Sequence, residues 1–152
     1  MPNWCRNRVT VFGEPEEIAK VTKIFKDEKS IFDNIIKSPD WRRLPNMKGE
    51  YSKLEQHKNP KTGEVIFETY NFPDGKNDDR WYDWNITNWG TKWDITVKSV
   101  EFGYEDSEQL EMEFETAWAP PEPICNRLRE MFEDLTISWF YDEPGMQVAG
   151  YL

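Results

Sequence analysis

Alternating apolar and polar residues predict several β-strands in this 152-residue chain. Residues 6–12 alternate in this way, and residues 93–100, 135–141 and 147–151 are expected to be further strands. The cleanest period of two lies in residues 108–116, where apolar side chains alternate with glutamates: Leu110, Glu111, Met112, Glu113, Phe114 and Glu115. We therefore expect a sheet in which one strand carries a row of glutamates on a single face.

Apolar residues at helical spacing predict two helices between these strands. The first begins at Pro15 and runs to about Lys29, because proline fits the first helical turn and the acidic residues beside it complement a helix N-terminus. The second follows the proline-rich stretch at 120–123 and carries Ile124 and Leu128 on one face. Residues 31–36 predict a short apolar element, and residues 103–107 predict a turn.

Between the first helix and the second strand the chain changes character. Residues 37–80 are rich in proline, glycine and charged side chains, which predicts an irregular excursion with one hairpin that turns at residues 61–63. Residues 81–94 hold four tryptophans separated by turn-forming residues, and we expect an ordered loop there. Together these segments predict an insertion at about residues 37–92 within a single domain of residues 1–152.

Without the insertion, the predicted order is strand, helix, strand, strand, helix, strand, followed by one more strand. This is the order of an α+β, ferredoxin-like split-βαβ fold, in which two helices cover one face of an antiparallel sheet. The term describes a shape, because the two cysteines cannot supply the four ligands of an iron–sulfur cluster. We expect no metal and no cofactor.

The charge of the chain is concentrated in its last third. The formal net charge is −10, and residues 99–152 contain thirteen acidic side chains against two arginines. Such a surface repels nucleic-acid and membrane phosphates and attracts a basic partner. The same charges can also form a solvated face that keeps the protein in solution. We expect a protein of the bacterial cytoplasm, because no apolar run is long enough for a membrane span or a secretory signal.

The glutamate row has two interpretations. In the split-βαβ order its strand lies between the first and second strands, so Arg6 and Arg8 on one flank and Lys98 on the other could form a charge ladder with it. Alternatively, the row is an acidic strip that binds a basic host or viral protein. The residues of this candidate interaction site are Glu111, Glu113 and Glu115.

The tryptophan-rich segment also has two interpretations. Tryptophans 4, 89, 93 and 118 could stack into one core cluster. Alternatively, the segment lines a pocket for a carbohydrate or a cationic small ligand, with hydrolysis by paired carboxylates as an option. The candidate pocket residues are Trp84, Asn88, Trp89, Trp93 and Asp94.

Catalysis has little further support in the sequence. The only histidine is His57, and no phosphate-binding loop, dinucleotide fingerprint or nucleophile motif is present. Cys5 and Cys125 are expected to be free thiols. An edge strand near the C-terminus could pair two copies into a homodimer.

Four motifs carry a resemblance to a known family. They are Met1-Pro2-Asn3-Trp4-Cys5, Asn88-Trp89-Gly90-Thr91-Lys92-Trp93-Asp94, Thr116-Ala117-Trp118-Ala119-Pro120-Pro121 and Tyr141-Asp142-Glu143-Pro144-Gly145. The chain resembles the Api92-like or YubB-like proteins of phages and conjugative plasmids. The resemblance implies a ferredoxin-like C-terminal part and a viral or mobile-element setting, and it carries over no site. We therefore expect a non-enzymatic accessory protein that binds another protein through an acidic sheet face.

Overall fold

The computed structural model describes residues 2–75 and 78–152. Met1 of the first motif and residues 76–77 of the expected excursion lie outside this description. The chain divides into two compact units, one formed by Met1–Lys37 with Trp84–Leu152 and the other by Ser38–Asp83. We call them the sheet unit and the hairpin unit.

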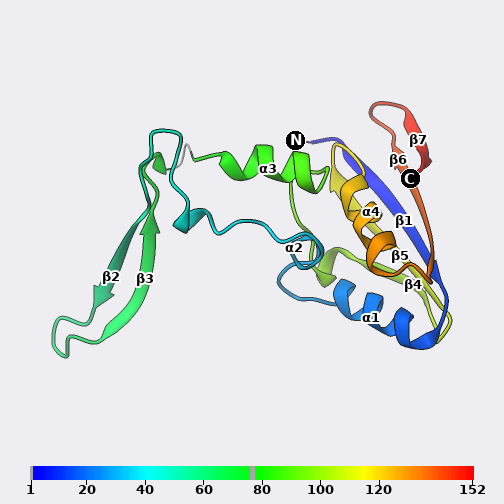
Figure 1. Cartoon of the computed structure of the whole chain (residues 1–152), viewed down its shortest axis with the longest axis horizontal. Coiled ribbons are helices and arrows are strands. Elements are labelled where there is room, and N and C mark those ends of the chain that lie inside the picture. The colour runs from blue at the N-terminus through cyan, green and yellow to red at the C-terminus, as the bar shows by residue number, and fades with distance from the viewer. Residues whose placement is uncertain (1, 76–77) are drawn as a thin grey trace. The chain divides into compact units, whose positions relative to one another are not determined.

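The sheet unit holds one antiparallel sheet with the strand order β4-β5-β1-β6-β7 (Figure 1). Its strands and main helices are β1 (Trp4–Phe12), α1 (Pro15–Phe25), α2 (Phe32–Ile35), β4 (Glu101–Glu105), β5 (Gln109–Ala117), α4 (Glu122–Met131), β6 (Thr136–Glu143) and β7 (Val148–Tyr151). The first strand lies between the third and the fourth of the βαββαβ core, as the split-βαβ arrangement requires. The predicted α+β, ferredoxin-like fold with an extra C-terminal strand is confirmed.

The sheet has one buried face and one exposed face, because side chains alternate across a strand. In β1, Cys5, Val9 and Val11 are buried, whereas Arg6 and Arg8 are exposed. Figure 1 shows α1 and α4 on the same side of the sheet. Buried apolar residues of both helices join those of the strands in one core: Ile18, Val21, Phe25, Ile124, Leu128, Leu110, Met112, Phe114, Ile137 and Trp139.

A buried asparagine joins the three central strands on the helix side. The amide nitrogen of Asn7 donates to Thr116 Oγ1 at 3.0 Å, and its oxygen accepts the indole N–H of Trp139 at 3.0 Å. Thr116 in turn donates its hydroxyl to the carbonyl of Ala119 at 2.7 Å. These contacts satisfy polar groups that would otherwise be costly to bury.

The expected strand at residues 93–100 is wrong. The segment is irregular and contains a short 3-10 helix, η3 (Val97–Ser99). Ser99 donates its hydroxyl to the carbonyl of Thr96 and accepts the Thr96 N–H, and such local hydrogen bonds compete with strand pairing. The strand begins instead at Glu101 and covers residues 103–105 of the expected turn, which is confined to the residues between β4 and β5.

The tryptophan-rich segment is helical in its first half, which corrects the expected loop. Helix α3 (Arg80–Asn88) covers this half, with Trp81, Trp84 and Asn88 at helical spacing. The second half turns at Gly90, whose φ of +81° is in the left-handed region. A Cβ atom at this position would lie 2.8 Å from the ring of Pro123, so the turn fits closely against the start of α4.

The hairpin unit contains η1 (Trp41–Arg43) and a two-stranded sheet of β2 (Lys53–Lys58) and β3 (Val65–Asn71). The predicted hairpin with its turn at residues 61–63 is confirmed. Both strands are largely exposed, so the hairpin contributes little core.

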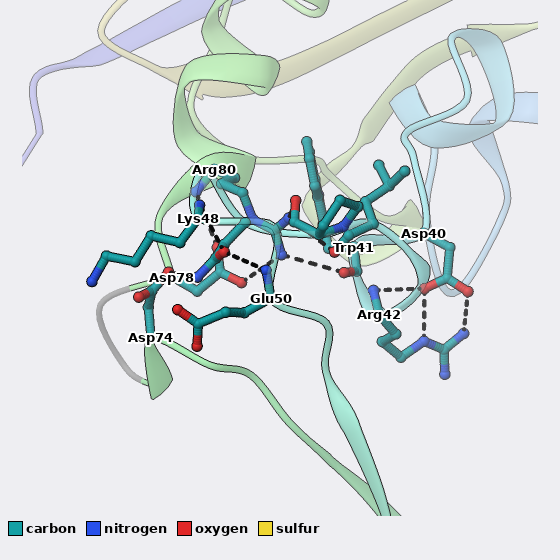
Figure 2. Close-up of polar contacts among 11 residues, drawn as sticks. Asp40, Trp41, Arg42, Lys48, Glu50, Asp74, Asp78 and Arg80 are labelled. Atoms are coloured by element: carbon teal, nitrogen blue, oxygen red, sulfur yellow. Dashed lines mark hydrogen bonds and ion pairs between the residues drawn. The ribbon is translucent and has the colours of Figure 1, made fainter.

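Hydrogen bonds around Arg80 hold the base of the hairpin unit (Figure 2). The guanidinium pairs with Asp78 through two hydrogen bonds and donates to the carbonyls of Trp41, Leu44 and Pro45. The hydrogen bonds from Arg80 hold the pKa of Asp78 below its ordinary value.

No helix within the described residues is long and apolar enough to cross a lipid bilayer.

Candidate functional site: an acidic groove on the open face of the sheet

Within the sheet unit, the face of the sheet opposite α1 and α4 carries mostly exposed side chains, and we call it the open face. It carries the side chains of β1 that alternate with the buried ones, together with their partners on the neighbouring strands. The strand register places its charged residues in two rows, Arg6 and Arg8 on β1 and Glu111, Glu113 and Glu115 on β5. One acidic residue lies on each side of these rows, Glu101 on β4 and Asp142 on β6. The predicted glutamate row therefore lies on the open face.

Two of the glutamates are paired with arginines. Arg8 Nε donates to Glu113 Oε1 at 2.7 Å, and Arg6 Nε lies 3.8 Å from Glu115 Oε1. Both pairs are exposed, so each contributes little to stability. The predicted neighbours Arg6 and Arg8 are confirmed, but Lys98 lies in η3 rather than on the strand that pairs with β5.

The second flank of the glutamate row is acidic instead of basic. Glu101 on β4 lies directly opposite Glu113, and like charges in that position repel each other. Asp142 on β6 lies opposite Arg6, which already faces Glu115. Among the described residues, Glu101, Glu111 and Asp142 make no ion pair. The open face therefore carries five carboxylates against two arginines.

A groove with a volume of about 780 Å³ crosses one end of the open face. Its charged lining consists of five carboxylates and three cations: Asp94, Glu101, Glu113, Glu115 and Asp142 against Arg6, Arg8 and Lys98. Trp4 and Trp93 give it an aromatic wall, and Glu111 lies on the open face outside the groove. The groove therefore brings together residues from both sites predicted from the sequence: glutamates of β5 and the end of the tryptophan-rich segment.

Two tryptophans form an exposed aromatic patch at this groove. The rings of Trp4 and Trp93 lie 6.2 Å apart between centroids and are tilted by 35°. Their exposed fractions are 43% and 40%, high for so large an apolar side chain. The Lys92 ammonium lies 4.6 Å from the centre of the Trp93 ring, so this ring already contacts a cation.

The predicted cluster of four tryptophans is not formed as expected. Trp89 is buried in the core, where its ring packs edge-on against Phe32 and its indole N–H donates to the carbonyl of Ile36 at 2.9 Å. Trp118 follows β5 with a φ of +72° and is 45% exposed. A left-handed backbone is rare for a bulky residue, and here the Trp118 N–H donates to the carbonyl of Asn3.

The other predicted pocket residues have contacts within the sheet unit. Trp84 packs edge-on against Trp89, and Asn88 donates its amide to the carbonyl of Trp84. Asp94 lines the groove, but its carboxylate accepts the backbone N–H groups at the start of α2: those of Ile31, Phe32 and Asp33. Burial raises the pKa of the Asp94 carboxyl, and these N–H donors oppose the rise.

The cysteines and the histidine do not line the groove. Cys5 and Cys125 are buried, and burial raises the pKa of Cys5 to about 11 and that of Cys125 above its ordinary value. His57 lies in the hairpin unit and stacks on Phe67. Within the described residues, no group of three or more metal-ligating side chains is assembled.

Sequence reasoning missed three contributors to this site: Glu101, Asp142 and Trp4. Glu101 lies where the strand boundary was placed wrongly, so its register against Glu113 was hidden. Asp142 was noted only as part of the motif at residues 141–145, and Trp4 was expected in the core. The alternation of β1 carries the missed signal, since Trp4 shares the parity of Arg6 and Arg8.

Comparisons with known proteins agree with this fold. A family model described as the ferredoxin-like domain in Api92-like protein matches residues 88–152. The crystal structure of a protein Api92 from Yersinia pseudotuberculosis aligns with a TM-score of 0.62 at 12% sequence identity, covering 99% of this chain and 93% of that chain. A search of curated proteins finds no significant match. The resemblance to Api92-like proteins is therefore confirmed: residues 88–152 match the family model of their ferredoxin-like domain, and nearly the whole chain shares the fold of the Yersinia protein.

Proposed function

We propose that this chain is a non-enzymatic interaction protein that binds a basic segment of another protein in the groove on the open face. The resemblance to proteins of phages and plasmids suggests a host or viral protein as the partner. The observation that carries the proposal is the surplus of carboxylates on the sheet face opposite α1 and α4. Repulsion between Glu101 and Glu113 costs stability, and a cationic partner would relieve it.

The composition of the groove supports arginine or lysine side chains as the groups recognised. Carboxylates bind guanidinium and ammonium groups through charge-assisted hydrogen bonds. The exposed ring of Trp4 offers a flat surface on which such a cation can stack. A sheet face with both features is suited to an extended basic segment, and electrostatic attraction would speed its association.

The first experiment is a fluorescence titration of the protein with an arginine-rich peptide and with a glutamate-rich peptide of the same length. We expect the arginine-rich peptide to change the tryptophan emission and to bind more weakly as salt increases. The triple variant Glu111→Lys, Glu113→Lys and Glu115→Lys should lose this binding. No response of the wild-type protein, or equal binding of both peptides, would contradict the proposal.

A matched variant separates the open face from net charge. Glu130→Lys, Glu133→Lys and Asp134→Lys change the charge by the same amount at exposed positions at and after the end of α4. We expect this control to retain most of the peptide binding. Equal loss in both triple variants would show that overall charge, rather than the groove, drives the interaction. Affinity purification from a host lysate with the same three proteins would then identify the natural partner.

A further inference from the structure

The two edges of the five-stranded sheet differ in how they are protected. Strand β4 has Glu101 and Glu105 within its five residues, and its pairing with β5 shifts register between Phe102 and Tyr104. Lys26 also pairs with Glu105 at 2.7 Å. Charged side chains and irregular pairing are the features by which natural edge strands avoid further pairing. The β4 edge is therefore closed to another strand.

The β7 edge has none of these features. Its residues are Val148, Ala149, Gly150 and Tyr151, with no charge and no proline, and its pairing with β6 is regular. Val148 is 43% exposed and Tyr151 is 74% exposed. An uncharged edge of this kind is free to accept a further strand.

The register of β7 shows which backbone groups face outward. Leu152 N–H donates to the carbonyl of Trp139 at 3.0 Å, so these two residues form a hydrogen-bonded pair of the antiparallel ladder. Hydrogen-bonded and non-hydrogen-bonded pairs alternate along such a ladder. Gly150 therefore bonds toward Tyr141 on β6, whereas Ala149 and Tyr151 direct their N–H and C=O groups away from the sheet.

We propose that β7 pairs with β7 of a second copy of this chain, antiparallel and centred on Gly150. In this register Ala149 of each copy lies opposite Tyr151 of the other, and each pair exchanges both of its N–H···O bonds. All outward backbone groups of Ala149 and Tyr151 are then satisfied. The contact is isologous, because each copy contributes the same strand, so it closes as a dimer.

The side chains fit this pairing. The two Gly150 residues meet as the non-hydrogen-bonded pair, where the strands approach most closely and a glycine adds no bulk. Each Tyr151 ring lies beside an alanine of the other copy, so a large residue faces a small one. No acidic residue enters the seam, although each copy carries a net charge of −10. The seam itself therefore adds no like-charge repulsion between two copies, which is what self-pairing of so acidic a chain requires.

The dimer has a consequence for the open face. A two-fold axis that pairs antiparallel edges is perpendicular to the sheet, so both open faces lie on the same side. Two acidic grooves then belong to one continuous sheet surface. The dimer does not depend on what binds in the groove, and its failure would leave the proposed function standing.

The first test is the mass of the full chain in solution, measured by light scattering and sedimentation over a range of concentrations. We expect a reversible dimer. Ala149→Pro removes one outward N–H and Ala149→Lys adds a charge to the seam, and both should give monomers with an unchanged circular dichroism spectrum. Tyr104→Lys, at the opposite edge, is the matched control and should remain a dimer. A monomeric wild-type protein, or a dimer that survives both Ala149 variants, would overturn the proposal.

Cross-linking tests the register directly. In the proposed pairing Gly150→Cys places two thiols on Cα atoms about 4.5 Å apart, within the range of a disulfide. An added Cβ at Gly150 meets only the Tyr141 ring, at 3.5 Å or more, so the variant should fold. We expect Gly150→Cys to form a covalent dimer on mild oxidation and Ala149→Cys to form far less. Equal cross-linking of the two variants would contradict a pairing centred on Gly150. It would mean that the two copies meet in another register or through another surface.

Discussion

Glu101 on β4 lies directly opposite Glu113 on β5, and the guanidinium bonded to Glu113 comes from Arg8 on the other flank. The sheet thus holds two carboxylates side by side where a basic residue would pair better with Glu113. Surfaces that serve only for stability favour opposite charges in such positions. The arrangement is understandable if the open face is kept acidic for a basic partner.

Glu101→Gln should stabilise the isolated protein. The substitution removes the repulsion across the strands without changing the shape of the side chain, and we expect a gain of about 0.2–1 kcal/mol in the free energy of unfolding. Urea denaturation at low salt measures it, and the gain should shrink at high salt. Glu108→Gln, an exposed change in the turn before β5, is the control. A loss of stability in Glu101→Gln would contradict this view of the pair.

Asp94→Ala should destabilise the sheet unit by about 2 kcal/mol, because the N–H groups of Phe32 and Asp33 at the start of α2 lose their acceptor. Chemical denaturation gives the change in the free energy of unfolding, with Glu133→Ala as an exposed control. If Asp94→Ala were as stable as wild type and only ligand binding suffered, the carboxylate would belong to a pocket rather than to the fold.

Asn7→Ala should cost about 1–3 kcal/mol, since it leaves the indole N–H of Trp139 buried without a partner. Differential scanning calorimetry would show the lower unfolding temperature. The double variant Asn7→Ala with Trp139→Phe removes the orphaned donor as well. We expect it to be less destabilised than the sum of the two single variants, and strict additivity would argue against this hydrogen bond.

Both thiols should be inert in the folded protein at neutral pH. A pKa of about 11 for Cys5 keeps the nucleophilic thiolate scarce, and burial excludes the reagent. Labelling with a thiol reagent should therefore follow global unfolding and should accelerate with urea. Rapid modification of either cysteine without denaturant would contradict the buried positions of Cys5 and Cys125.

The fold was predictable where one face of an element is buried. β5 alternates with a strict period of two because Leu110, Met112 and Phe114 enter the core, so its strand and its glutamate row were read correctly. The segment from Asp94 to Ser99 alternates too. There, however, the Asp94 carboxylate accepts the N–H of Ile95 and the Ser99 hydroxyl donates to the carbonyl of Thr96, so these local bonds replace strand pairing. Asp94 and Ser99 fit the alternation of a strand, but their short polar side chains bond to the nearby backbone instead.

The site was only half predictable for a related reason. The glutamates of β5 were visible because they lie on one strand, whereas their acidic neighbours Glu101 and Asp142 come from other strands. Their meeting depends on register, and an error in one strand boundary conceals it. The exposure of Trp4 could not be read from its size, since large aromatic residues are usually expected inside.

The alternation of β1 and β5 also places two kinds of position side by side in each strand: buried residues that packing restricts, and exposed residues that it does not. A saturation mutagenesis map selected for stability should show tolerant and intolerant codons in strict succession, with Val9 or Met112 restricted by packing and Arg8 or Glu113 tolerant of substitution. Successive generations could therefore exchange the entire recognition surface while the scaffold stays intact. If the open face binds a partner as proposed, its binding residues can change in evolution without loss of the core.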